Sequence, residues 1–164
     1  MTRKMRISFR REARTQRVLL DGEDITGEIR TPEVTAAVSD YCAVPVVREI
    51  LVELQRKTSE SGPVVLEGRD IGTVVFPDAE FKFYMVASDK ARAERRRKDF
   101  EKTGVIKTVE EIQKELIERD RKDSSREHSP LKKSDDAVVI DTTGLGIEEQ
   151  VSLIIEKVLK ETAE

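Results

Sequence analysis

The most informative part of the chain reads Glu67-Gly68-Arg69-Asp70-Ile71-Gly72-Thr73-Val74-Val75-Phe76-Pro77. It follows the apolar run 64–66, which has the composition of a short buried strand. Loops after the carboxyl ends of parallel strands bind ligands in open α/β sheets. We therefore expect Arg69 and Asp70 to project into a crevice. From this segment alone, a surface turn in which the two side chains pair with each other is an equal alternative.

Strand and helix signals alternate along the rest of the second half of the chain. Further strands are expected at 81–86 and 137–140. Helices are expected at about 89–102, 109–121 and 147–159. Ser88 can cap the first of these helices, and Thr108 with Glu111 forms a capping box for the second. The alternation predicts an α/β fold with a parallel sheet.

The first part of the chain has a different pattern. Residues 5–30 alternate apolar and polar side chains around the turn signals Asp21-Gly22 and Thr26-Gly27, which predicts a small antiparallel meander. Thr31 followed by Pro32 marks the start of a helix to about residue 41. Pro45 begins a second helix, which ends before Gly62.

Composition narrows the classes of function. Thirty basic and thirty-three acidic residues give a net charge of -3, so the whole molecule is not an electrostatic partner for nucleic acid or an anionic membrane. The apolar runs are too short for a membrane span or a signal peptide. The single cysteine, Cys42, cannot form an internal disulfide, which fits a reducing cytoplasm.

Two further segments carry polar groups that suit an anion or nucleotide site. The first is the mixed charge run Glu118 to Arg126, which taken alone is typical of a solvated helix end. The second is the connection from Ser39 to Arg48, which brings a hydroxyl and a guanidinium near each other and taken alone is an ordinary helix connection.

Together these segments resemble the cytidylate kinases, nucleoside monophosphate kinases that phosphorylate CMP and dCMP. The resemblance extends from about Met5 to Lys160, and the run Gly68 to Pro77 is a highly specific signature. The other matching strings are Ile29-Arg30-Thr31-Pro32-Glu33-Val34, Val47-Arg48-Glu49, Glu118-Arg119-Asp120 and Ser129-Pro130-Leu131.

The resemblance implies a role for each matching polar residue. The contacts to the cytosine ring match Ser39, Arg48 and Asp70. The contacts to the sugar match Arg119 and Asp123, and those to the CMP phosphate match Arg69 and Arg126. This division suits the chemistry, because a carboxylate accepts from the cytosine amino group and a planar guanidinium binds two phosphate oxygens.

The resemblance also implies a mobile lid at about residues 89–126. Arginines of this lid close over the ATP phosphates, and among Arg92, Arg95, Arg96 and Arg97 the best positional match is Arg95. Arg95, Arg69 and Arg126 are therefore the expected catalytic residues, because positioned positive charge stabilises phosphoryl transfer. Without this context, the four arginines would be interpreted as a solvated helix face.

The sequence contains no G-x-x-x-x-G-K-[ST] phosphate loop, since none of its eight glycines precedes a lysine. The expected fold is therefore a P-loop kinase-like parallel sheet without its first strand, which would lie upstream of Met1. Residues 1–62 would form the CMP-binding insert, and residues 63–164 the rest of the kinase core. A gap beside the strand at 64–66 would make the chain marginally stable and leave it little activity alone.

The expected function is transfer of the ATP γ-phosphate to CMP or dCMP, in cytoplasmic pyrimidine nucleotide metabolism. ATP and Mg²⁺ are the implied cofactors, with the phosphate-loop ligands of the metal absent from this chain. If complete, the protein is expected to be a monomer, without membrane or nucleic-acid partners. Two alternatives remain open. One is a non-catalytic CMP-binding module, and the other is an RNA-associated module that uses the basic patch from Arg92 to Lys98.

Overall fold

The computed structural model describes residues 5–13, 15–102 and 104–162. The chain divides into two compact units. Unit 1 comprises Met1–Gly68 and Arg126–Pro130, and unit 2 comprises Arg69–Ser125 and Leu131–Glu164. The short segment Arg126–Pro130 therefore belongs to a different unit from the residues on either side of it.

Unit 1 begins with a three-stranded antiparallel sheet. Its strands are β1 (Ile7–Glu12), β2 (Thr15–Leu20) and β3 (Glu23–Asp24), in the order β1-β2-β3. The register places Phe9 opposite Val18. Thr26 Oγ1 accepts a hydrogen bond from the Val18 amide at 2.9 Å, which closes the turn after β3. The predicted meander is confirmed.

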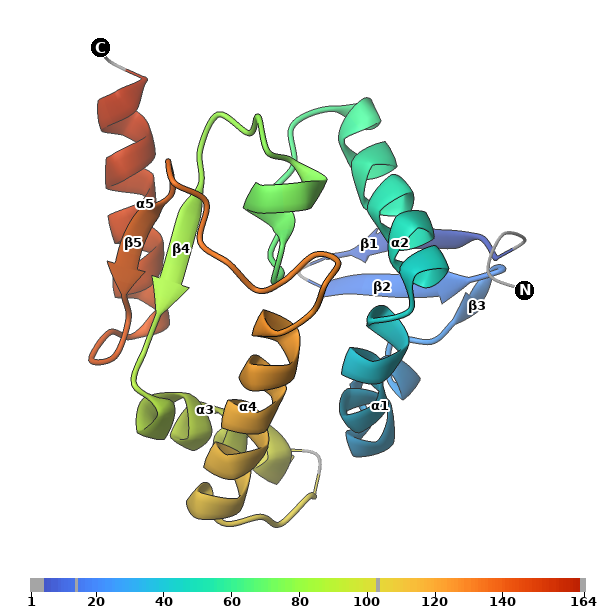
Figure 1. The fold of residues 1–164 in the computed structure, drawn as a ribbon, viewed down its shortest axis with the longest axis vertical. Coiled ribbons are helices and arrows are strands. Elements are labelled where there is room, and N and C mark those ends of the chain that lie inside the picture. The colour runs from blue at the N-terminus through green and yellow to red at the C-terminus, as the bar shows by residue number, and fades with distance from the viewer. Residues whose placement is uncertain (1–4, 14, 103, 163–164) are drawn as a thin grey trace. The chain divides into compact units, whose positions relative to one another are not determined.

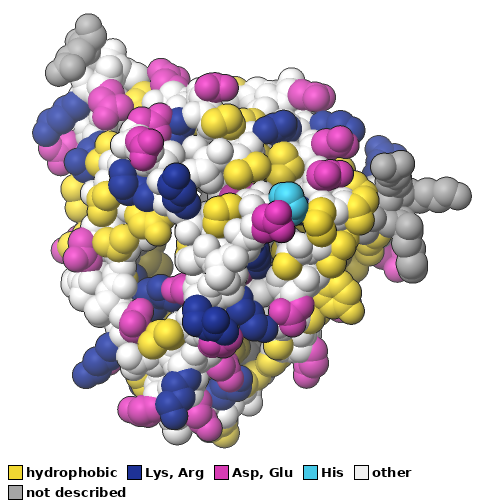
Figure 2. Space-filling model, in the orientation of Figure 1, with side chains coloured by type: hydrophobic (Ala, Val, Ile, Leu, Met, Phe, Trp, Pro, Cys, Tyr) yellow, Lys and Arg dark blue, Asp and Glu magenta, His cyan; other side chains and the backbone are white. Residues whose placement is uncertain are grey.

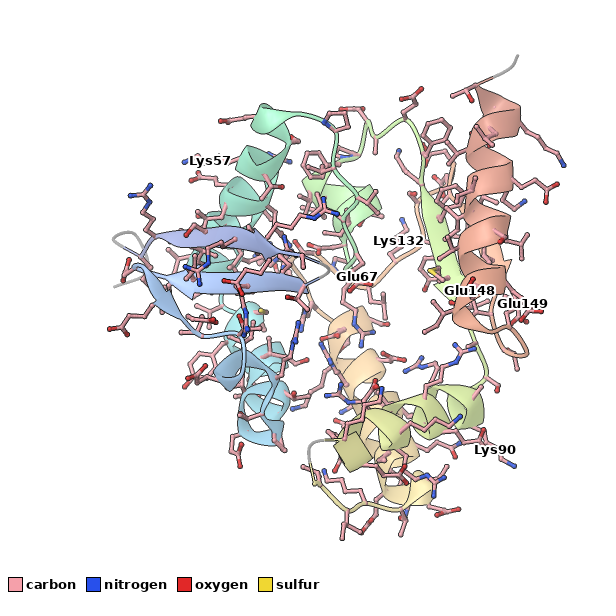
Figure 3. The ribbon with its side chains drawn as sticks, turned by 180° about the vertical axis from the view of Figure 1, so that it is seen from behind. Lys57, Glu67, Lys90, Lys132, Glu148 and Glu149 are labelled. Atoms are coloured by element: carbon pink, nitrogen blue, oxygen red, sulfur yellow. The ribbon has the colours of Figure 1, made fainter. Side chains whose placement is uncertain are left out.

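Two helices follow in unit 1, after a 3-10 turn η2 (Glu28–Arg30). Helix α1 (Pro32–Cys42) is capped by Thr31, whose side chain accepts from the Val34 amide. Helix α2 (Pro45–Lys57) continues into a 3-10 turn η3 (Thr58–Ser61). Both predicted helix starts are confirmed, and Lys57 lies in the last turn of α2, where a cation complements the helix dipole (Figure 3).

Unit 2 contains a parallel pair of strands, β4 (Phe83–Val86) and β5 (Val138–Asp141). Helix α5 (Ile147–Glu161) runs along one face of this pair (Figure 1). Gly146 precedes α5, and its amide donates to Glu149 Oε2 at 2.6 Å. Glu148 and Glu149 lie side by side in the first turn of α5 (Figure 3). A mixed α/β fold with parallel strands is therefore confirmed.

Helices α3 (Asp89–Lys102) and α4 (Val109–Ser124) form the rest of unit 2. The Ser88 hydroxyl accepts from the Ala91 amide, and Thr108 and Glu111 form the predicted capping box. Ala93, Phe100 and Ile112 make the buried core between the two helices. Helix α4 continues to Ser124, a few residues beyond its predicted end near Arg121, so the charge run is helical except for its last two residues.

The strand predicted at residues 64–66 is wrong. These residues have no strand conformation, and Val64 and Val65 are exposed. An extended segment becomes a strand only when a neighbour takes up its backbone hydrogen bonds, and β4 pairs with β5 instead. The motif segment therefore follows an irregular stretch after Gly62 rather than a buried strand.

The visible surface mixes charges of both signs with apolar side chains (Figure 2). No single-sign field covers this face, in keeping with the nearly balanced composition. Within the described residues, no helix combines the length and apolar character that a membrane crossing requires.

The capping box of α4 provides a test of the local structure. Replacing Thr108 by Ala leaves the Glu111 amide without its acceptor, so we expect the free energy of unfolding to fall by about 1 kcal/mol. Urea denaturation followed by circular dichroism measures this change. The control is Thr162→Ala, at the C-terminal end of α5, where we expect a smaller loss. Equal losses would contradict the assignment.

Candidate functional site

The motif segment forms a single turn of π-type helix, η4 (Ile71–Val75). The Asp70 carbonyl accepts from the amides of Val74 and Val75, and the Phe76 amide donates to the Ile71 carbonyl at 2.7 Å. Val75 is buried and anchors the turn. Asp70, which precedes the turn, is only 4% exposed. Turns of this kind are frequent at functional sites.

Arg69 does not pair with its neighbour Asp70 but with two carboxylates of α4. Its Nη1 donates to Asp120 Oδ1, and its Nε lies 3.1 Å from Asp123 Oδ2. Asp123 is almost fully buried, with 1% of its side chain exposed. Arg119 Nε lies 3.7 Å from the same Asp123 oxygen. The surface-turn alternative for the motif is therefore wrong.

Arg92 of α3 extends this group. Its Nη1 donates to Asp120 Oδ2 at 2.5 Å, so the two oxygens of one carboxylate each hold a different arginine. We call Arg69, Arg92, Arg119, Asp120 and Asp123 the arginine–carboxylate cluster. All five side chains belong to unit 2. Three guanidinium groups against two carboxylates leave an excess positive charge, which suits an anionic ligand.

Burial and hydrogen bonding have opposing effects on the ionisation of the cluster. Burial opposes ionisation of Asp120, but the hydrogen bonds from Arg92 and Arg69 outweigh it and lower the pKa of Asp120 below its ordinary value. Burial, followed by the positive charge of Arg69, lowers the pKa of Arg119. An anion bound here would offset the repulsion between the guanidinium groups.

Arg95 lies elsewhere in unit 2. Its guanidinium donates to Thr142 Oγ1 at 3.1 Å, to the Thr142 carbonyl, and to the Leu145 carbonyl at 3.3 Å. Thr142 is buried and donates in turn to the Val86 carbonyl. Arg95 therefore joins α3 to the turn between β5 and α5. Its expected role at the ATP phosphates stays a prediction.

The remaining expected site residues lie in unit 1. Ser39 is buried in α1, and Arg48 is half-buried in the first turn of α2. Arg126 Nη2 donates to the Ser39 carbonyl at 3.1 Å. Unit 1 thus brings Arg126 to Ser39, although the two residues are far apart in the sequence. The roles of these residues toward a nucleotide stay predictions.

The arginines of α3 do not form a solvated face. Arg92, Arg95 and Arg96 are half-buried, and the Arg96 guanidinium lies 4.6 Å from the centre of the Phe100 ring. Arg97 is exposed and pairs with Glu101, whereas Lys90 projects from the start of α3 (Figure 3). Most of the basic patch is thus occupied by contacts within the protein, which disfavours an RNA-associated module.

Sequence reasoning missed the roles of Asp120 and Arg92 in the cluster. Asp120 stood within a matching string, but its contacts depend on how α3 and α4 pack, which spacing does not show. No group of three or more His, Cys, Asp or Glu side chains in the described part of the chain is arranged to hold a metal ion.

Comparisons with known proteins agree on one family. A family model described as cytidylate kinase matches residues 1–161. A cytidylate kinase from Geobacter sp. is 47% identical over 161 residues, covering 98% of this chain and 69% of that protein. One from Lactobacillus johnsonii is 46% identical, covering 94% and 67%. One from Bacillus anthracis is 46% identical, covering 97% and 71%. The chain thus spans about two thirds of these relatives' length.

The lowered pKa of Asp120 predicts how stability depends on pH. A carboxyl whose pKa is lowered by folding stabilises the protein above its unfolded pKa, near 3.8, and loses this effect as the pH falls through the folded value. We expect Asp120→Asn to cost about 2 kcal/mol at pH 7. The difference from the unchanged chain should shrink below about pH 4.

Urea unfolding at several pH values measures this difference. Glu118→Gln is the matched control, because it removes the same charge from α4 at an exposed pair with Arg121. We expect a smaller effect there, since exposed ion pairs contribute little. A pH-independent difference for Asp120→Asn would contradict the assignment.

Proposed function

The chain belongs to the cytidylate kinase family, and on this premise we propose that it binds CMP or dCMP as the acceptor of an ATP γ-phosphate. The observation that carries the proposal is the arginine–carboxylate cluster. It keeps Arg69 half-buried beside a net positive charge, in the segment with the most specific family signature. A nucleoside monophosphate carries the complementary negative charge.

Arg69 and Arg126 are the proposed contacts of the CMP phosphate. In Arg69, the Nη1 and Nε contacts leave Nη2 without a partner among the described residues. Those N–H groups are available to phosphate oxygens, which accept from a guanidinium with better geometry than from an ammonium. Arg119 and Asp123 are the proposed contacts of the sugar.

Asp70 is the proposed reader of the base, together with Ser39 and Arg48. A buried carboxylate accepts a hydrogen bond from the cytosine amino group. Uracil would place a carbonyl oxygen at that position and leave the carboxylate facing another acceptor, which is costly in a buried site. Preference for cytosine over uracil follows from this difference.

Transfer itself would proceed by attack of a CMP phosphate oxygen on the γ-phosphorus of ATP, with ADP as the leaving group. The described arginines supply positive charge for the developing charge on the transferred group. The sequence has no G-x-x-x-x-G-K-[ST] loop to hold the donor phosphates. We therefore propose that this chain alone binds the acceptor and transfers phosphate only slowly.

Base preference tests the role of Asp70. We expect the chain to bind CMP at least about tenfold more tightly than UMP, because placing a uracil carbonyl oxygen against a buried carboxylate costs more than about 1 kcal/mol. Asp70→Asn should reduce this preference, since an amide can serve either base. Calorimetric titration measures both affinities.

The matched control for Asp70→Asn is Asp78→Asn, which makes the same change at an exposed position after the motif. It should keep the preference of the unchanged chain. An Asp70→Asn chain with the full preference for CMP would refute the proposed reading of the base.

Turnover tests the proposed limit on catalysis. With CMP, ATP and Mg²⁺, ADP release by the chain alone should stay close to the no-enzyme rate, while CMP binding is measurable. A coupled assay that follows ADP decides this. Turnover in the ordinary enzyme range of about 1 per second or more would overturn the limit, and it would also exclude a purely non-catalytic CMP-binding module.

A further inference from the structure

We propose that Asp120 is a positioning residue, whose carboxylate holds the Arg69 guanidinium in the orientation that accepts the phosphate of the nucleotide and joins it to Arg92 of α3. This inference rests on the proposed function, because it names a residue that supports binding of the same acceptor. Asp120 itself would not touch the nucleotide.

The carboxylate of Asp120 contacts two arginines. Its two carboxylate oxygens are divided between Arg69 and Arg92, so its orientation is fixed from two sides. With 23% of its side chain exposed, Asp120 is more shielded than an ordinary surface carboxylate. A partly shielded, charge-assisted pair keeps both guanidinium groups close to one geometry.

The guanidinium of Arg69 in turn contacts two carboxylates. Asp120 holds Nη1, and the buried Asp123 holds Nε, so two carboxylates hold two different nitrogens of the guanidinium plane. A planar group that is held at two of its nitrogens can rotate little about its long side chain. Loss of Asp120 would leave a single contact on Arg69 and restore rotational freedom, which phosphate binding would then have to remove.

Asp120 also links Arg69 to Arg92. Arg69 adjoins the η4 turn, whereas Arg92 is in α3, and Asp120 of α4 is the group that they share. A carboxylate that lies between two guanidinium groups offsets their mutual repulsion. Asp120 therefore allows both positive charges to be present at one place.

Simple electrostatics makes the opposite prediction, which allows a sharp test. Removing a carboxylate raises the net positive charge of the cluster, so charge alone would make a phosphate bind more tightly. Positioning predicts weaker binding in spite of the added charge. A purely structural ion pair predicts that affinities for a nucleotide and for its nucleoside change together.

The experiment compares CMP with cytidine, which lacks the phosphate, in NMR titrations of the full chain and of Asp120→Asn. We expect the CMP dissociation constant to rise about tenfold and the cytidine constant to change less than about twofold. Glu118→Gln, with the same charge change on α4, should leave both constants unchanged. Asp120→Glu, which keeps the charge but shifts it by one methylene, should give an intermediate CMP constant.

Each outcome bears on one claim. An unchanged or tighter CMP constant in folded Asp120→Asn overturns the positioning role while leaving the proposed function in place. Parallel loss of CMP and cytidine affinity also overturns it, in favour of a structural pair. If Asp120→Asn does not fold, Asp120→Glu is judged by the same ratio of constants. Failure of the unchanged chain to bind CMP overturns the proposed function and this inference together.

Discussion

The ion pairs between Arg69 and the two carboxylates of α4 are the constraint on which the candidate site of unit 2 depends. Asp123 is buried and Asp120 is partly shielded, so neither carboxylate is stable there without its arginine partners. The capped helix α4 presents both on one side, and packing of α3 against α4 brings Arg92 to the same place. Ordinary helix packing thus assembles a site with excess positive charge.

Much of the fold follows from local sequence signals. Thr31 with Pro32, Ser88, and the Thr108–Glu111 pair each mark a helix start that the structure has, because capping is decided by residues within one turn. The prediction of a strand at 64–66 was wrong, because strand formation depends on a partner that local composition does not specify. The prediction of the meander was confirmed, because its strands are neighbours in sequence.

The sequence indicated candidate site residues but not the contacts between them. The motif around Arg69 and Asp70 singled out one segment, yet an even choice remained between a surface turn and side chains that project into a crevice. Arg69 forms ion pairs with carboxylates about fifty residues away, and charge spacing within one segment cannot show such a pairing. The contacts of the α3 arginines likewise depend on tertiary packing. Arg92 and Arg95 contact residues outside α3, whereas the exposed Arg97 pairs within the helix.

The most direct test of the account is a crystal structure of the chain with CMP bound. The account predicts phosphate oxygens on the Arg69 guanidinium, with its contacts to Asp120 and Asp123 retained, and the cytosine amino group donating to Asp70. A nucleotide bound away from Arg69, or an Arg69 that leaves both carboxylates to reach the phosphate, would contradict it.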